Sequence, residues 1–119
     1  MADIIYQNVN DDSGPGPELM GANTLTGNDV YNNSNEDLGD IKEIMIDVVS
    51  GKIAYAVLSF GGVLGVGEKL FAIPWKALIL DTENKRFILN VEKSKFENAK
   101  GFDTDHWPTQ ADSSLVNVL

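Results

Sequence analysis

The sequence predicts an all-β domain, a small antiparallel barrel or sandwich of six or so short strands. Runs of apolar and alternating residues recur roughly 8–12 residues apart and are separated by turn-forming residues. The 119-residue chain shows neither a strand–helix–strand pattern nor an internal repeat. Its length suits one domain.

Charge and composition divide the chain into three parts. Residues 1–22 are an acidic leader, in which Gly14-Pro15-Gly16-Pro17 excludes helix and central strand. We expect the domain at residues 23–108 and a tail at residues 109–119, polar and then apolar. Residues 1–40 carry a net charge of −8, residues 41–100 carry +2 and residues 101–119 carry −3. The acidity of the chain therefore belongs to its flanks.

Three short segments open the predicted strand order. Ile4-Ile5-Tyr6 is the only apolar patch of the leader, and we expect it to dock as a short edge strand. Thr24–Leu25 and Val30–Tyr31 are predicted as short strands around a turn at Gly27-Asn28-Asp29.

A long alternating run follows. Leu38–Val48 places Ile44, Ile46 and Val48 on one predicted face, with Glu43 and Asp47 on the other. The tetrad Val49-Ser50-Gly51-Lys52 predicts a hairpin turn after this strand.

The next strand is apolar on both faces. Ile53–Phe60 is rich in small and β-branched residues, which is typical of a strand covered on two sides. A glycine-rich reversal over residues 61–67 leads into Glu68–Ile73, which alternates again.

The remaining predicted elements are short. In order, they are a helical turn at Pro74-Trp75-Lys76-Ala77, a strand at Leu78-Ile79-Leu80, a tight turn at Asp81–Asn84 with positive φ allowed at Asn84, a strand at Arg86–Val91, and a helix at Glu92–Ala99 stopped by Gly101.

Composition excludes several function classes. The chain has no cysteine, which excludes disulfides, thiol nucleophiles and Cys-ligated metal sites. A net charge of −9 argues against nucleic-acid binding, which needs a basic footprint. We expect no signal peptide after Met1-Ala2-Asp3. The apolar-rich stretch Ile53–Gly67 is shorter than the ~18–20 residues of a membrane helix, so the expected location is cytoplasmic, without membrane insertion.

Three motifs come close to a chemical site. The glycine-rich loop has Glu68 where a phosphate-binding loop needs Lys, and a strand rather than a helix follows. Residues 8–14 resemble the start of a calcium loop, but their glycine falls one place late and no Glu stands at the twelfth position of the loop. The single histidine, His106, stands near Asp103 and Asp105, which is too few ligands for a zinc site. We therefore predict no catalytic residues, no cofactor and no metal.

Contact surfaces are the better candidates for function. The candidate residues are Val63, Leu64 and Val66 in the glycine-rich loop, Trp75, and the pair His106 and Trp107, which we expect to form a C-terminal latch on the barrel. The apolar tail at Leu115–Leu119 and the leader patch are further contact surfaces, each small enough to be buried within one copy. Exposed edges and apolar tails favour self-association, so we expect a homo-oligomer, most simply a dimer.

An ordered series of motifs runs along the chain from about Ala22 to Pro108. The motifs are Gly27-Asn28-Asp29-Val30-Tyr31-Asn32, Glu36-Asp37-Leu38-Gly39-Asp40-Ile41, Ile44-Met45-Ile46-Asp47, Ser50-Gly51-Lys52-Ile53-Ala54-Tyr55-Ala56-Val57-Leu58, Lys69-Leu70-Phe71-Ala72-Ile73-Pro74-Trp75-Lys76-Ala77-Leu78, Asn98-Ala99-Lys100-Gly101-Phe102-Asp103 and His106-Trp107-Pro108. This series resembles the PRC-barrel domain family, known from the photosynthetic reaction centre H subunit, from a ribosome maturation factor and from stand-alone bacterial members. Asn35 stands where the family often has Gly, but Asn also adopts the left-handed turn.

This resemblance implies a six-stranded β-barrel and a role in protein contact or assembly rather than catalysis. We therefore expect a non-enzymatic protein-interaction module that also binds itself. One alternative is a small-ligand or cation sensor that uses Asp103, Asp105 and His106 or a barrel-end pocket. Another is an accessory factor in ribosome or RNA processing.

Overall fold

The computed structural model describes residues 3–5, 19–61, 67–112 and 114, with the backbone alone for residues 3–5. Its described elements, in chain order, are β1 (Asp3–Ile5), α1 (Ala22–Leu25), β2 (Asp29–Tyr31), β3 (Asp37–Asp47), β4 (Lys52–Phe60), β5 (Lys69–Ile73), the 3-10 turn η2 (Trp75–Ala77), β6 (Leu78–Asp81), β7 (Arg86–Leu89) and α2 (Lys93–Asn98).

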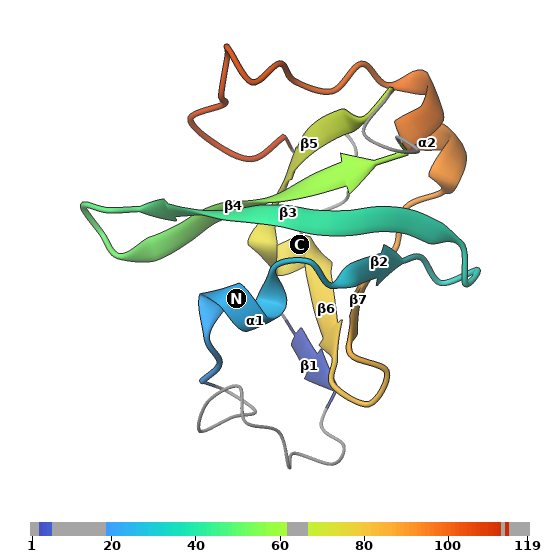
Figure 1. Ribbon diagram of the computed structural model, residues 1–119, viewed down its shortest axis with the longest axis horizontal. Helices are drawn as coiled ribbons and strands as arrows, with labels where there is room; N and C mark the ends of the chain where they lie inside the picture. The colour runs from blue at the N-terminus through green and yellow to red at the C-terminus, as the bar shows by residue number, and fades with distance from the viewer. Residues whose placement is uncertain (1–2, 6–18, 62–66, 113, 115–119) are drawn as a thin grey trace.

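The described strands form one sheet in the order β1-β6-β7-β2-β3-β4-β5. Strands β2 to β7 curl into a half-barrel, which confirms the predicted six-stranded, mostly-β fold (Figure 1). The first strand adds a short edge strand that runs parallel to β6. The expected docking of the leader patch is therefore confirmed for Ile4 and Ile5, while Tyr6 lies outside the described residues.

The sheet is mixed rather than wholly antiparallel, because β2 runs parallel to β7. Two hairpins, β2–β3 and β6–β7, lie side by side with these two strands in contact. Parallel neighbours require a long connection, and the whole of β3 to β6 separates them in sequence. Alternation predicts strands but does not fix the direction of a non-local partner.

The main core fills the inside of the curl. Helix α2 contributes Phe96, which is fully buried and contacts the rings of Phe60 and Phe71 at centroid distances of 5.5 and 4.9 Å. Lys69 Nζ donates to three carbonyl oxygens at the end of this helix, those of Phe96, Glu97 and Ala99, where a cation is favoured. Buried residues from α1, the strands, the β7–α2 connection and α2 make up this core: Leu25, Val30, Leu38, Ile41, Ile44, Ala56, Leu58, Phe60, Phe71, Ile73, Leu78, Leu80, Phe87, Leu89, Val91 and Phe96.

The second face of β4 is buried by the C-terminal segment. We call residues 99–112 the strap; it runs across the outer side of β4 and β5 (Figure 1). It is held by Phe102 N donating to Leu70 O and Asp112 N donating to Ala72 O, each at 2.8 Å. Tyr55 Oη also donates to Pro108 O at 2.8 Å. The prediction that the fourth strand is covered on both sides is therefore confirmed.

Several local predictions need correction. Thr24–Leu25 lies in α1, not in a strand, because Leu25 points into the main core from a helical turn. Positive φ in the β6–β7 turn falls at Lys85 (φ 53°) rather than Asn84. The prediction for Asn35 is confirmed by its φ of 62°. The turn at residues 75–77 and the helix before Gly101 are also confirmed.

Candidate functional site

The β3–β4 hairpin extends beyond the rest of the sheet (Figure 1). Its turn is fixed by polar groups: Asp47 Oδ1 accepts the amides of Val49 and Ser50 at 3.0 and 3.2 Å, and Gly51 supplies a φ of 76°. Asp47 N-terminal to the turn thus forms an Asx-type cap. The hairpin end is a defined structure rather than an irregular loop.

Three large apolar side chains are exposed at this end. Ile46 is 51% exposed, Val48 is 89% exposed and Val49 is 95% exposed. We call these three residues the apolar tip. Of the three residues predicted to share one face, Ile44 is buried, whereas Ile46 and Val48 are exposed.

The physical reason lies in the sheet. Strand β3 has a register irregularity between Met45 and Ile46, which breaks the alternation assumed from the sequence. Strand β2 pairs with β3 only at Asp37–Asp40, so the hairpin end is two strands wide. A two-stranded ribbon buries little by itself. The apolar tip therefore faces solvent.

A groove of about 710 Å³ lies beside the start of β4, next to the turn end of the same hairpin. Trp75 lies in η2 after Pro74, and its ring contacts the buried Phe87 at a centroid distance of 5.9 Å, edge to face. The strap contributes Ala111. We call this the base groove, and its lining residues are Gly51, Lys52, Ile53, Ala54, Pro74, Trp75, Lys76 and Ala111.

The base groove is apolar with a basic rim. Lys52 and Lys76 are its charged lining residues, both exposed, and none of the lining residues is acidic. Lys52 has Asp47 as its cross-strand partner, whereas Lys76 comes from outside the hairpin. The apolar lining favours an apolar partner group, and the lysines at the rim favour an acidic one.

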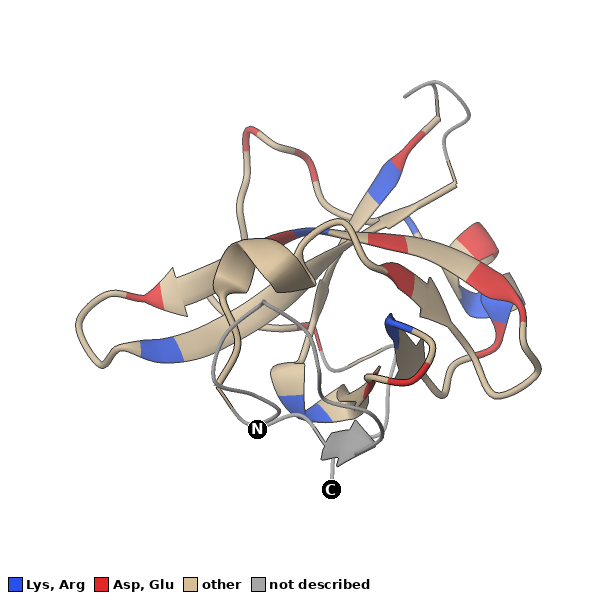
Figure 2. Ribbon diagram, turned by 60° about the horizontal axis from the view of Figure 1, so that its bottom comes forward, with Lys and Arg blue, Asp and Glu red and all other residues tan. Residues whose placement is uncertain are grey.

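An acidic surface lies elsewhere, along β2 and β3 (Figure 2). Asp29 and Asp40 are direct cross-strand partners. Partial burial raises the pKa of Asp40, and the nearby charges of Asp29, Glu68 and Asp37 raise it further, against Lys42. Like charges placed opposite each other in a sheet are destabilising.

Glu68 is held in the ionised form beside this surface. Hydrogen bonds from Lys42 at 2.9 Å and from Ser59 at 2.7 Å lower the pKa of Glu68. The carboxylate therefore joins β3, β4 and the start of β5.

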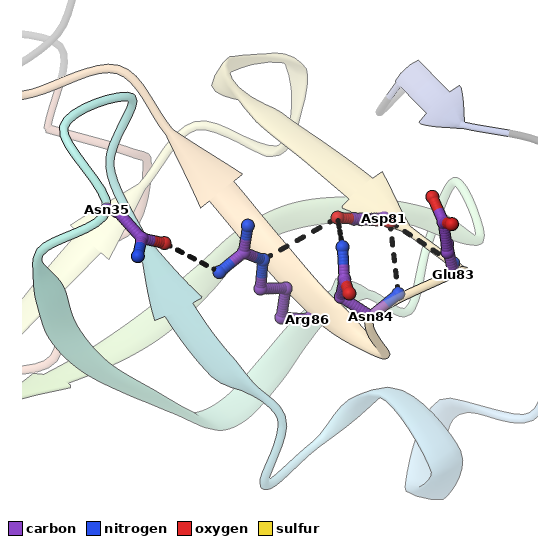
Figure 3. Close-up of polar contacts among 5 residues, drawn as sticks. All are labelled: Asn35, Asp81, Glu83, Asn84 and Arg86. Carbon is purple, nitrogen blue, oxygen red and sulfur yellow. Dashed lines mark hydrogen bonds and ion pairs between the residues drawn. The ribbon is translucent and has the colours of Figure 1, made fainter.

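A polar network joins the β6–β7 turn to the β2–β3 turn (Figure 3). The buried carboxylate of Asp81 accepts the amides of Glu83 and Asn84 and the Asn84 side chain, at 3.1, 3.2 and 2.8 Å. Arg86 Nε lies 3.5 Å from Asp81 Oδ2. Arg86 also donates to Asn35 Oδ1 at 3.0 Å, which links the β6–β7 turn to the β2–β3 turn.

The electrostatics of this network are those of a structural ion pair. Burial would raise the pKa of Asp81, but the hydrogen bonds of Asn84 and Glu83 and the charge of Arg86 outweigh it and lower the pKa. The Arg86 guanidinium lies 4.8 Å from the centre of the Tyr31 ring, a cation–π distance. Every partner stabilises the ionised form of Asp81, so it is poorly suited to proton transfer.

The residues predicted as contact sites lie in different parts of the structure. Val63, Leu64 and Val66 lie outside the described residues. Trp75 lines the base groove. Trp107 lies in the strap, 41% exposed, with its ring 5.1 Å from that of Phe102. The leader patch and the tail at residues 115–119 are likewise undescribed beyond the backbone of β1.

The strap lies across the sheet as the predicted latch would, but its contacts with the sheet are made by Phe102 and Ala111 and not by His106. His106 has 83% of its side chain exposed and lies 3.9 Å from Asp103, whereas Phe102 and Ala111 pack on the sheet. Asp103 Oδ1 accepts the amide of Asp105 at 3.0 Å, a local turn.

Sequence reasoning missed Ile46, Val48 and Val49. A signal was present: Val48 and Val49 directly precede and enter a predicted turn, where β-branched residues have no conformational advantage.

Within the described ranges, no group of three or more His, Asp or Glu side chains is arranged to hold a metal ion. No helix of the described residues is long and apolar enough to cross a membrane.

Comparison with protein families gives one match. The family model of the PRC-barrel domain matches residues 17–95, more than half of the chain. The matched range includes β2 to β7, the apolar tip and most of the base groove. No curated protein matches the chain.

Proposed function

The chain belongs to the PRC-barrel domain family, and on this premise we propose that it is a non-enzymatic module that docks onto another protein through the apolar tip and the base groove. The carrying observation is the exposure of Ile46, Val48 and Val49 at the end of a projecting hairpin. The family is generally without catalytic activity.

The energetics of the apolar tip support docking. Complete burial of one Val or Ile side chain is worth about 1.5–3 kcal/mol. Burial of three side chains that are half to almost fully exposed would therefore supply roughly 3–7 kcal/mol to a complex. This free energy is gained only in a complex, because in the free protein the three side chains remain in contact with water.

The described ionisable groups support the absence of catalysis. The lowered pKa values belong to Asp81 and Glu68, whose partners hold them ionised. The raised pKa belongs to Asp40, which lies among other carboxylates. The histidine of the chain, His106, extends into solvent from the strap. None of these described groups has the nucleophile–base geometry that acyl or phosphoryl transfer requires.

The charge distribution supports a protein partner rather than a nucleic acid. Two lysines at the base groove are too few for a phosphate-tracking surface. The acidic positions along β2 and β3 would repel a nucleic-acid backbone. We place the docking in the cytoplasm, where stabilising disulfides are rare, because a chain without cysteine does not depend on them.

Site-specific photo-cross-linking in native lysate tests the proposal. A photoreactive amino acid at Val49 should give a discrete cross-linked band to a protein. The same group at Ser94, an exposed position on α2, is the matched control and should give none. Equal labelling from the two positions, or no product from Val49, would contradict docking through the apolar tip.

A further inference from the structure

We propose that the partner of the apolar tip is the base groove of a second copy of this chain, in a two-fold symmetric dimer. This inference rests on the proposed function and names its partner. In the dimer, each copy inserts Val48 and Val49 into the groove beside the other copy's hairpin.

The placement of the two features fits two-fold symmetry. A two-fold interface uses the same patch on both copies, so the patch must be self-complementary. The apolar tip and the base groove are neighbours, since the tip ends at Val49 and the groove begins at Gly51 and Lys52. When a two-fold axis passes between the tip and the groove, the tip of each copy can enter the groove of the other copy, so the same contact is made twice.

The chemistry of the two features is also complementary. The groove offers the faces of Ile53, Pro74 and Trp75 to an apolar side chain. Asp47 stands directly before the tip and is exposed, and its cross-strand partner in the same hairpin is Lys52, whereas Lys76 lines the groove from outside the hairpin. Insertion of the tip therefore brings the Asp47 carboxylate of one copy toward the Lys76 ammonium group of the other, and opposite charges fix the register of such contacts.

Pairing through the edge of β5 is a less suitable route to a dimer. The strap already occupies this edge, where the amides of Phe102 and Asp112 bond to Leu70 and Ala72. An occupied edge offers fewer free backbone groups for strand addition between copies. The exposed apolar surface of the described residues is instead concentrated at the hairpin end.

The size of the patch predicts a weak dimer. The tip and the groove together comprise eleven residues per copy, whereas a standard interface uses about 20–30 residues a side. We therefore expect concentration-dependent dimerisation in the micromolar range rather than a permanent dimer.

Sedimentation of the full chain between about 5 and 500 µM tests the proposal. The wild type should shift from monomer toward dimer. Replacement of Val48 and Val49 by Ser, which preserves net charge, should weaken association about a hundredfold. Replacement of Lys76 by Glu, which leaves the Asp47–Lys52 cross-strand pair in place, should weaken it about tenfold. A control with Lys85 replaced by Glu has the same net charge and should match the wild type.

Mixing the tip variant with the groove variant distinguishes the contact. A mixed dimer retains one intact tip–groove contact, because each variant keeps the feature that the other lacks. The mixture should therefore associate more strongly than either variant alone. Circular dichroism of each variant verifies folding.

Three outcomes would overturn this inference. They are a monomer at every concentration, a groove variant that dimerises like the wild type, and a mixture no stronger than its parts. If the chain stays monomeric while Val49 cross-links to a different protein, the dimer fails and the proposed function stands. If Val49 gives no product at all, both fail.

Discussion

Replacement of Asp81 by Ala tests whether the network of Figure 3 stabilises the fold. The side chain of Asp81 is 6% exposed and accepts two backbone amides and one side-chain amide. Its removal would leave the Glu83 and Asn84 amides without their acceptor. It would also leave Arg86, 25% exposed, without its carboxylate.

The expected loss is about 2–4 kcal/mol in the free energy of unfolding. Removal of one partner from a fully buried ion pair costs about 3–5 kcal/mol. The Arg86 side chain is a quarter exposed and keeps Asn35 and the Tyr31 ring as partners, which reduces that figure. The freed turn amides add about 1 kcal/mol or less each, because water reaches a surface turn.

The pH dependence of this loss has a definite sign. The folded-state pKa of Asp81 lies below its ordinary value, so the folded protein binds fewer protons than the unfolded chain. Stability from this group is present above about pH 4 and is lost as the pH falls through the folded-state pKa. The difference between wild type and Asp81→Ala should therefore shrink below about pH 4.

Urea unfolding at pH 7 and at acidic pH measures both effects, with midpoints compared at equal m-value. Asp103→Ala is the control, since Asp103 lies 3.9 Å from His106 with both side chains well exposed. It should change stability by less than about 0.5 kcal/mol. A loss below about 1 kcal/mol for Asp81→Ala, or a loss that grows in acid, would refute the assigned role.

Three further predictions concern other parts of the sheet. Asp40→Asn should raise the unfolding free energy at pH 7 by about 0.2–1 kcal/mol, because it removes a carboxylate of raised pKa facing Asp29; thermal unfolding measures this, and a lower midpoint would contradict it. Gly39→Ala should lower stability by at least about 3 kcal/mol or prevent folding, because φ is 130° and a Cβ would collide with the Ser59 carbonyl oxygen. Gly27→Ala, with no atom near its Cβ, should cost only about 1 kcal/mol, and equal losses at the two glycines would disprove the steric argument. Val48→Ser with Val49→Ser should change the free energy of unfolding by less than about 0.5 kcal/mol, and a larger loss by chemical denaturation would mean that the tip supports the fold.

Local sequence patterns predicted where the strands and helices lie better than they predicted which segments pair with or cover them. The two-sided apolar run at Ile53–Phe60 predicted β4 correctly, since its alternate residues enter two different cores. Its outer cover could not be identified from the sequence, because the strap bonds to Leu70 and Ala72 from residues some 30 to 40 positions away. The parallel pairing of β2 with β7 is non-local in the same way.

The candidate site was predicted in part. Trp75 was singled out and lines the base groove. Ile46 was placed on one face with Ile44 because alternation assumes a regular strand, whereas the irregularity after Met45 and the narrow sheet at that point leave Ile46 exposed and Ile44 buried. Whether a face is buried depends on how many strands lie beside it, which a single run of residues does not encode.

The turn residues themselves argue that Val48 and Val49 serve a contact rather than the hairpin. The four-residue loop is closed by the Asp47 carboxylate, by the Gly51 amide on Asp47 O at 2.7 Å, and by Ser50 Oγ on the Lys52 amide. These groups supply the geometry that such a loop needs. The Val49 backbone amide takes part in this closure, but any residue other than proline would supply that amide. The two valine side chains add no hydrogen bond and lie 89% and 95% exposed, although small or polar residues would serve equally well there. Because the strap and the two helices bury the apolar faces of the curled sheet, the exposed valines are a local feature of the hairpin end, and a second molecule that covers them is the simplest physical account of that feature.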